Sequence, residues 1–341
     1  MNLFETSRQV TVLGAGMVGV SCALALQAKG WSVTLVDQQA PGEETSHGNA
    51  GVISRSSLLP FNRPGLWQSL PAMLLRPGPN LKIRPSALSH WQWLWRFLWH
   101  AKRSSFEVTT VALDGLIQLS SDTHRAWLKK AHVESRLRDT GWLWLYAHAA
   151  AFESGAASRE VLQEFGVVCE VLNAPSLQAL EPHLAPAFSH ALWVKDAASV
   201  DNPRAVVKAY VAQFLEAGGQ LVQSKVIALQ QQPSGWQWVN PEGGVHWTPN
   251  IVVAMGPWSE SLLEASQLQN NFKVNMGFER GYHRHFQPME GIRLGRPIYD
   301  LSGAYVLSPM KDEQGADILR MTTGVELAAR DEGSNLQQLE C

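Results

Sequence analysis

The sequence predicts an α/β protein in which a domain with a parallel sheet carries an inserted α+β domain built on a mixed antiparallel sheet. Three observations predict it. A strand, a glycine-rich turn, a helix and a second strand follow one another over residues 10–37. The apolar run Ile251–Val253 is typical of a strand in a parallel sheet, and Trp-rich, strand-like runs such as residues 141–146 lie between the two. At 341 residues the chain is long enough for two domains.

Composition and charge exclude several classes of function. The 28 basic and 30 acidic residues give a net charge of -2, and no Lys/Arg run is long enough to bind a phosphate backbone, so nucleic acid is not an expected partner. The three cysteines are far apart and the eleven histidines are scattered, so we expect no metal site. We also expect no signal peptide and no transmembrane helix, which favours a cytoplasmic location.

The first strand, residues 10–13, leads into the turn Gly14-Ala15-Gly16-Met17-Val18-Gly19 and then into a helix at residues 20–29. Gly14 permits a tight turn, Gly16 lets a pyrophosphate approach the backbone, and Gly19 lets the helix and the strand pack closely. The helix N-terminus would hold the anion, which makes Met17 and Val18 candidate cofactor contacts as well.

Gly30 ends this helix, and a second strand at residues 31–36 ends at Asp37, which lies 18 residues after Gly19. A carboxylate at this point accepts hydrogen bonds from ribose hydroxyls, and Gln38 follows it directly. The strand, the turn, the helix and the acid together predict a dinucleotide site. They do not separate NAD from FAD, because both cofactors use the same turn.

The segment Thr45-Ser46-His47-Gly48-Asn49-Ala50-Gly51 carries a more specific signal. It resembles the segment of the FAD-dependent D-amino-acid dehydrogenase and oxidase family that runs beside the FAD pyrophosphate and under the flavin ring. This resemblance implies FAD as the cofactor and makes Thr45, Ser46, Asn49, Ala50 and Gly51 candidate contacts. The alternative is an ordinary polar loop ending in glycine.

The resemblance continues along the chain. Residues 201–204 precede a helix at 205–217 and a strand at 220–229, which is how this family re-enters its FAD domain. Val226 matches the position whose backbone contacts the adenine. Residues 250–259 resemble the second nucleotide motif of the family, in which Ala254, Gly256 and Trp258 are the candidate contacts.

The resemblance divides the chain into a Rossmann-like FAD-binding domain and a substrate domain inserted into it. The FAD-binding domain takes residues 1–87 and 196–271, and the substrate domain takes 88–195 and 272–330. Residues 331–341 begin a C-terminal segment. The resemblance also implies an Arg-Pro-x-x-x-Asp-Gly-x-Pro motif and a Gly-His-x-x-x-Gly turn beyond this point, which the sequence lacks, so we expect the chain as given to be a poor dehydrogenase.

Oxidation of an amino acid needs a cation that holds the substrate carboxylate and a polar group that positions the amine. Arg280 and His283 resemble the Arg-Gly turn that the family places near the flavin edge, and Tyr305 resembles a substrate-contacting tyrosine. Arg320, in a predicted strand at 320–326, is a further candidate. The alternative for each arginine is a solvated or salt-bridged strand end.

Residues 90–100 form a Trp-rich helix in which Gln92, Arg96, His100 and Arg103 make one narrow polar stripe. Such a helix is mostly embedded in its surroundings. Two alternatives stay open: a helix packed within the substrate domain, and a Trp-anchored helix lying in a membrane interface.

The resemblance implies an enzyme that oxidises D-amino acids to 2-oxo acids and ammonia. The alternatives are a secondary-amine or 2-hydroxy-acid oxidoreductase of the same fold and a non-catalytic fragment. The expected partners are an amino acid or related amine as substrate and a quinone or other electron acceptor. The resemblance also permits peripheral contact of the protein with the inner membrane face.

Overall fold

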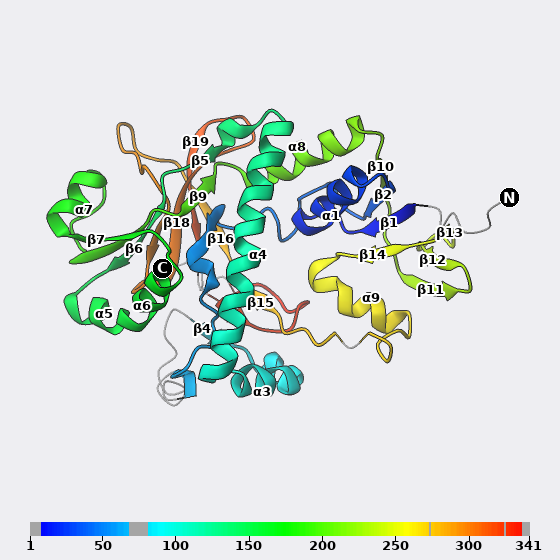
Figure 1. Cartoon of the computed structure of the whole chain (residues 1–341), viewed down its shortest axis with the longest axis horizontal. Helices are drawn as coiled ribbons and strands as arrows, with labels where there is room; N and C mark the ends of the chain where they lie inside the picture. The colour runs from blue at the N-terminus through cyan, green and yellow to red at the C-terminus, as the bar shows by residue number, and fades with distance from the viewer. Residues whose placement is uncertain (1–7, 68–80, 273, 324, 336–341) are drawn as a thin grey trace. The chain divides into compact units, whose positions relative to one another are not determined.

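The computed structural model describes residues 8–67, 81–272, 274–323 and 325–335 (Figure 1). The chain divides into two compact units. Unit 1 comprises Met1–His47, Trp127–Val133 and Pro203–Met276. Unit 2 comprises Gly48–Ala126, Glu134–Asn202 and Gly277–Cys341.

Unit 1 is built on a parallel sheet whose strand order is β10-β2-β1-β14. The strands are β1 (Gln9–Leu13), β2 (Ser32–Asp37), β10 (Gln220–Gln223) and β14 (Ile251–Val253). These strands are rich in apolar and β-branched residues, of which Val12, Leu13 and Leu35 are completely buried. Helices α1 (Met17–Ala28) and α8 (Pro203–Glu216) pack against each other, and Gln27 donates from Nε2 to Phe214 O and Ala217 O. The predicted α/β fold class is confirmed.

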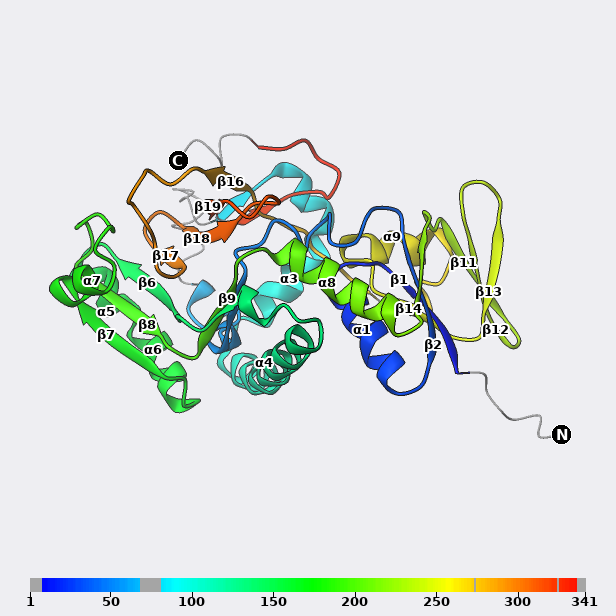
Figure 2. The same cartoon turned by 90° about the horizontal axis from the view of Figure 1, so that it is seen from above.

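A second, antiparallel sheet of unit 1 has the strand order β11-β12-β13 (Figure 2). Its strands are β11 (Ala228–Gln232), β12 (Gly235–Val239) and β13 (Val245–Thr248), and the 3-10 helix η4 (Gly256–Trp258) and α9 (Ser259–Ala265) follow β14. The continuous strand predicted at 220–229 is therefore wrong. The chain leaves the parallel sheet after Gln223, because Ser224 N donates to Asp37 O at the end of β2 and the next strand pairs with β12 instead.

Unit 2 contains a mixed sheet with the strand order β16-β19-β18-β17-β6-β8-β7. The strands are β6 (Trp142–Tyr146), β7 (Cys169–Asn173), β8 (His190–Val194), β16 (His283–Phe286), β17 (Ile298–Asp300), β18 (Tyr305–Lys311) and β19 (Asp317–Thr322). All neighbours are antiparallel except β17 and β6. One apolar core, which includes Leu143, Leu145 and Ile298, lies on one face, and another, which includes Trp144 and Tyr146, lies on the other.

Two three-stranded sheets complete unit 2. One has the order β3-β9-β5, with β3 (Val52–Ser54), β5 (Leu137–Arg138) and β9 (Ala197–Val200). The other has the order β15-β20-β4, with β4 (Leu81–Ile83), β15 (Glu279–Arg280) and β20 (Val325–Leu327). The strand predicted at 320–326 is thus two strands, β19 and β20, which belong to different sheets.

The remaining helices begin in unit 2. They are η1 (Arg55–Leu58), η2 (Pro85–His90), α3 (Trp91–Trp99), α4 (Arg103–Lys130), η3 (Glu134–Arg136), α5 (Ala149–Ser154), α6 (Ala156–Glu164) and α7 (Ala174–Leu180). Arg103 does not extend the polar stripe of α3, because α3 ends at Trp99 and Arg103 is the first residue of α4.

The two units do not follow the predicted domain ranges throughout. Residues 48–67, which the sequence assigns to the FAD-binding domain, group with unit 2, and the short stretch Trp127–Val133 groups with unit 1. The functional assignment of the segments remains a prediction.

Candidate functional site

At two positions of the glycine turn in unit 1, the space is too small for any side chain. Gly14 has a φ of +103°, its N–H donates to Val36 O at 2.7 Å, and a Cβ there would lie 2.3 Å from Ala254 O. A Cβ on Gly19 would lie 1.8 Å from Gly14 O. The predicted roles of Gly14 and Gly19 in turning the chain and packing the helix therefore match the geometry.

The N-terminus of α1 differs from this crowded turn. A Cβ on Gly16 would meet only Ser46 Oγ, at 3.2 Å, and Val18 is 67% exposed. Ser46 Oγ accepts a hydrogen bond from Met17 N at 2.9 Å, and the first turn carries no acidic residue. The positive end of the helix therefore has a hydroxyl beside it and no carboxylate to neutralise it, which suits an anionic ligand.

Asp37 ends β2 beside this turn. Its Oδ2 accepts from Ala15 N at 2.6 Å, and its Oδ1 accepts from Gln39 N at 2.8 Å. Each carboxylate oxygen can accept a further bond, and the side chain is only partly buried. Asp37 thus holds the glycine turn in place and remains available to ribose hydroxyls. Gln38 and Thr45 are exposed.

The turn after β14 forms the other wall of this cradle. Ala254 N donates to Leu13 O at 2.8 Å, Gly256 has a φ of +51°, and Trp258 N donates to Met255 O at 3.1 Å. The side chain of Val226 is buried among core residues such as Leu13 and Val36. The backbone contact that the resemblance implies for Val226 remains a prediction.

The remaining cofactor candidates, Asn49, Ala50 and Gly51, form a turn of unit 2. Asn49 Oδ1 accepts from Gly51 N at 2.8 Å, and Gly51 has a φ of +68°. Ser308 Oγ donates to Ala50 O at 2.8 Å, and Arg320 Nη1 donates to Asn49 O at 3.0 Å. The sheet therefore fixes the conformation of this turn through two side chains.

All four catalytic candidates lie on strands of unit 2, and three of them share its seven-stranded sheet, but they do not converge. Arg320 pairs with Ser308 across β19 and β18, and its Nε donates to His285 Nε2 at 3.0 Å. His283 lies on the same face, and a Cβ on Gly48 would approach its ring to 2.8 Å. Arg320 is 3% exposed, and burial lowers the pKa of its guanidinium. His283 and Arg320 thus flank the Asn49–Gly51 turn.

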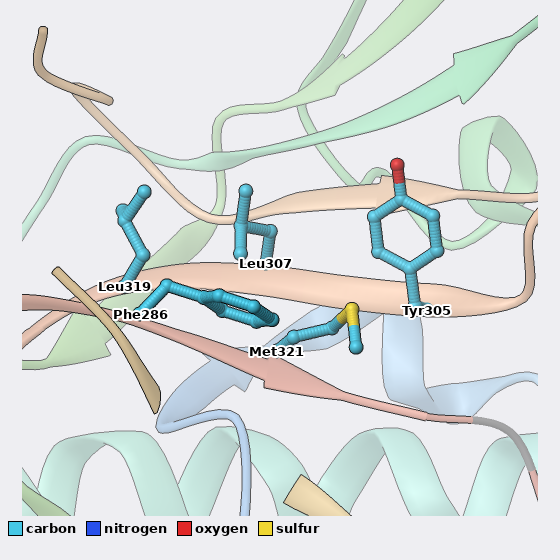
Figure 3. A pocket seen from close by; sticks show the side chains of 5 residues that line it. All are labelled: Phe286, Tyr305, Leu307, Leu319 and Met321. Atoms are coloured by element: carbon cyan, nitrogen blue, oxygen red, sulfur yellow. The ribbon is translucent and has the colours of Figure 1, made fainter. Parts of the chain in front are cut away.

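Tyr305 projects from the opposite face of the sheet. It alternates with Val306, which pairs with Thr322 on the His283 face, and it lines an apolar pocket of about 360 Å³ with Phe286, Leu307, Leu319 and Met321 (Figure 3). Burial and then the nearby Asp300 carboxylate raise the pKa of Tyr305. The structure does not bring Tyr305 together with His283 and Arg320, and its substrate role remains a prediction.

Arg280 lies in a network around Glu326, a carboxylate that is fully buried. Tyr282 OH donates to Glu326 Oε2 at 2.7 Å, Asn335 Nδ2 donates to Oε1 at 2.9 Å, and Arg280 Nε lies 3.9 Å from Oε2. Arg84 Nη1 approaches Oε1 to 3.6 Å. Among the described residues, Nη1 of Arg280 is buried without a hydrogen-bond partner.

The sequence interpretation gave no role to Glu326 or Tyr282, although both lie in the segments that resemble the family. The signal available was an acid between Val325 and Leu327 in a predicted strand, because an acid buried there requires partners. Burial raises the pKa of Tyr282.

Across the described ranges, no group of His, Cys, Asp or Glu side chains could hold a metal ion. No helix within those ranges is both long and apolar enough to cross a bilayer.

A family model described as FAD dependent oxidoreductase (DAO) matches residues 9–336. The chain belongs to this family. A D-amino-acid oxidase from Bradyrhizobium diazoefficiens is 32% identical to this chain over 285 residues, which are 81% of the chain and 65% of that relative. The chain therefore spans just under two thirds of that relative's length. The resemblance predicted from Thr45–Gly51 is confirmed at the level of the family.

Solved structures share the fold. Glycine oxidase from Geobacillus kaustophilus matches with a TM-score of 0.67 and 14% identity over 97% of this chain and 75% of that chain. L-proline dehydrogenase from P. horikoshii matches with a TM-score of 0.64 and 14% identity over 97% of this chain and 74% of that chain.

FAD, the expected cofactor, is the cofactor of this family. The residues of unit 1 fit it: Gly16 would leave room for a diphosphate at the N-terminus of α1, which carries no acidic residue, and Asp37 could offer its carboxylate to a ribose. In unit 2, the Asn49–Gly51 turn has no bulky side chain and is held rigidly.

Proposed function

We propose that this FAD-dependent oxidoreductase oxidises D-amino acids at the Cα–N bond, giving imines that water converts to 2-oxo acids and ammonia. The observation that carries the proposal is the 32% identity to a D-amino-acid oxidase over 81% of the chain. The cradle around Gly16 and Asp37 supports it, because it suits the diphosphate and ribose of FAD. Bound FAD would accept the hydride that leaves the substrate carbon.

Arg280 is the best candidate for holding the substrate carboxylate. Its Nη1 lacks a hydrogen-bond partner among the described residues, and a buried donor without a partner destabilises the free protein. Glu326 lies 3.9 Å from Nε and orients the guanidinium without a short bond to it. A planar guanidinium can bind both oxygens of a carboxylate, which fixes the orientation of an amino acid.

Arg320 plays a different part in this proposal. Its guanidinium already donates to Asn49 O and His285 Nε2, so it is a positioning residue for the turn at 49–51. A buried cation next to that turn would also stabilise negative charge on a ligand lying against it.

The experiment compares D- and L-amino acids, glycine, secondary amines and 2-hydroxy acids as substrates of the purified, FAD-supplemented chain. Oxygen and an artificial dye serve as alternative electron acceptors. We expect 2-oxo acid and ammonia from D-amino acids alone. Turnover only of secondary amines or 2-hydroxy acids would replace the proposed substrate class.

The carboxylate role of Arg280 predicts the behaviour of Arg280→Met. We expect KM for D-amino acids to rise by at least tenfold while FAD content is unchanged, because the guanidinium would bind substrate and not cofactor. Arg284→Met is the matched control, since Arg284 is exposed on the neighbouring strand β16. An unchanged KM in Arg280→Met would assign the carboxylate to another residue.

A further inference from the structure

The two sides of helix α3 are both aromatic but have different surroundings. Trp93 and Phe97 stack on each other with ring centroids 5.1 Å apart, and Trp93 fills the space beside Gly277, where a Cβ would lie 2.3 Å from the ring. Trp91, Trp95 and Trp99 recur every four residues on another side. The first side packs against Gly277, whereas the other side is largely exposed.

The outward side is exposed although it is aromatic. Trp91 is 62% exposed, Trp95 54% and Trp99 57%, and α3 has no buried residue at all. The expectation that this helix is mostly embedded is therefore wrong for the chain by itself. Trp67, 45% exposed, contacts Trp95 edge to face with centroids 6.5 Å apart. We call Trp67, Trp91, Trp95 and Trp99 the tryptophan face.

Cations border the tryptophan face. Arg96 is exposed on α3, and Lys102 Nζ lies 5.5 Å from the centroid of the Trp99 ring. The surrounding sequence is one-sided in charge: residues 45–106 contain eight Lys or Arg residues and no Asp or Glu. Arg55, Arg84 and Arg103 are paired with acids from outside this segment, so the cations that count for the tryptophan face are Arg96 and Lys102, which border it.

We propose that the tryptophan face docks onto an anionic phospholipid surface. Tryptophan rings are favourable at the boundary between headgroups and acyl chains, and neighbouring Lys and Arg residues attract anionic lipids. With nine residues, α3 is about 14 Å long, so it would lie in the interface and not cross it.

Charge argues against a second copy of the chain as the occupant. A twofold interface through this face would bring the exposed cations Arg96 and Lys102 of both copies together, and like charges would repel. An anionic lipid surface instead complements both the rings and the cations. The proposal does not depend on the substrate, because it concerns α3 and its neighbours alone.

The test is flotation of the full chain with vesicles of phosphatidylcholine alone or of phosphatidylcholine with phosphatidylglycerol. We expect binding to the mixed vesicles and a decline of at least tenfold between low salt and 0.5 M salt. Binding to neither vesicle type, or equal binding to both, would overturn the proposal.

Variants locate the contact. Trp91→Ser combined with Trp95→Ser and Trp99→Ser should reduce vesicle binding at least tenfold, and Arg96→Glu combined with Lys102→Glu should reduce it roughly tenfold. Trp247→Ser is the control, since Trp247 is 51% exposed on β13 in unit 1 and lies outside the basic segment. Unchanged FAD content and thermal unfolding in each variant show that the fold is retained. A dimer in analytical ultracentrifugation that dissociates in the triple variant would instead assign the face to a second copy.

Discussion

Gly16 and Gly19 lie three residues apart, but a side chain would meet very different surroundings at each. At Gly19 it would overlap Gly14 O, whereas at Gly16 it would meet only Ser46 Oγ. We therefore predict that Gly16→Val folds but binds no FAD, because the branched side chain would occupy the space of the diphosphate. The measurements are flavin absorbance after gel filtration and thermal unfolding without cofactor.

Gly115→Ala is the matched control for this substitution. Gly115 lies within α4 and has no atom within 4 Å of its Cβ position, so this change should leave FAD content intact. Parental FAD content in Gly16→Val would refute the placement of the diphosphate at this turn.

Asp37 has two roles that two substitutions can separate. Its carboxylate supports the turn through Ala15 N and Gln39 N, and it is available to a ribose. We predict that Asp37→Ala weakens FAD binding by about 1.5–3 kcal/mol, or roughly ten- to a hundredfold in Kd. Asp37→Asn should lose less, since an amide oxygen still accepts one bond.

Equilibrium dialysis against FAD measures these affinities. Asp312→Ala is the control, because Asp312 Oδ1 likewise accepts from two backbone N–H groups, those of Gln314 and Ala316, in the hairpin between β18 and β19. If Asp37→Ala and Asp312→Ala retain FAD equally well, Asp37 serves only the turn.

At the scale of elements, the link between the β18–β19 hairpin and the Asn49–Gly51 turn is open to test. Arg320→Met would remove the hydrogen bonds that Arg320 donates to Asn49 O and His285 Nε2, which costs about 1–3 kcal/mol of stability. We predict that loss in urea unfolding, together with lower FAD occupancy. Arg284→Met, on exposed β16, should change neither quantity. Wild-type stability and occupancy in Arg320→Met would show that the turn holds its shape without the hairpin.

The elements that the sequence predicted well are those specified locally. The unit from β1 to β2 follows from apolar strands, the glycine turn and a helix that ends shortly before Gly30, all within 30 residues. The face on which Tyr305 lies is set instead by the register of β18 against β17 and β19. A shift by one residue would move Tyr305 to the other face, and the register depends on partners far away in the sequence.

The break between α3 and α4 shows a second limit. The polar stripe from Gln92 to Arg103 fits one helix, but the chain turns after Trp99, and Ala101 is buried at the turn. A helical period cannot reveal such a turn when no proline or glycine marks it. The network at Glu326 was equally hidden, because Arg84, Arg280 and Asn335 approach it from three separate segments.

At the scale of the whole molecule, the division into two units explains why domain ranges could not be drawn from the sequence. Residues 48–67 follow the glycine turn closely, yet β3 pairs with β9, which lies over 140 residues further on. Composition does not change at His47, so no local signal marks the boundary. Contacts distant in the sequence decide it.

Binding of the cofactor should also raise the thermal stability of the whole chain. A ligand that binds only the folded state stabilises it by about 2.7 kcal/mol at a concentration 100 times Kd. We therefore predict that FAD raises Tm by several degrees, whereas NAD at the same concentration does not. The cradle of unit 1 alone would accept either dinucleotide, so this selectivity has to come from a flavin-specific contact such as the one expected at Asn49–Gly51. Gly16→Val should abolish the rise in Tm with FAD, because the branched side chain would occupy the space of the diphosphate. Equal shifts with FAD and NAD would mean that only the shared dinucleotide part is bound.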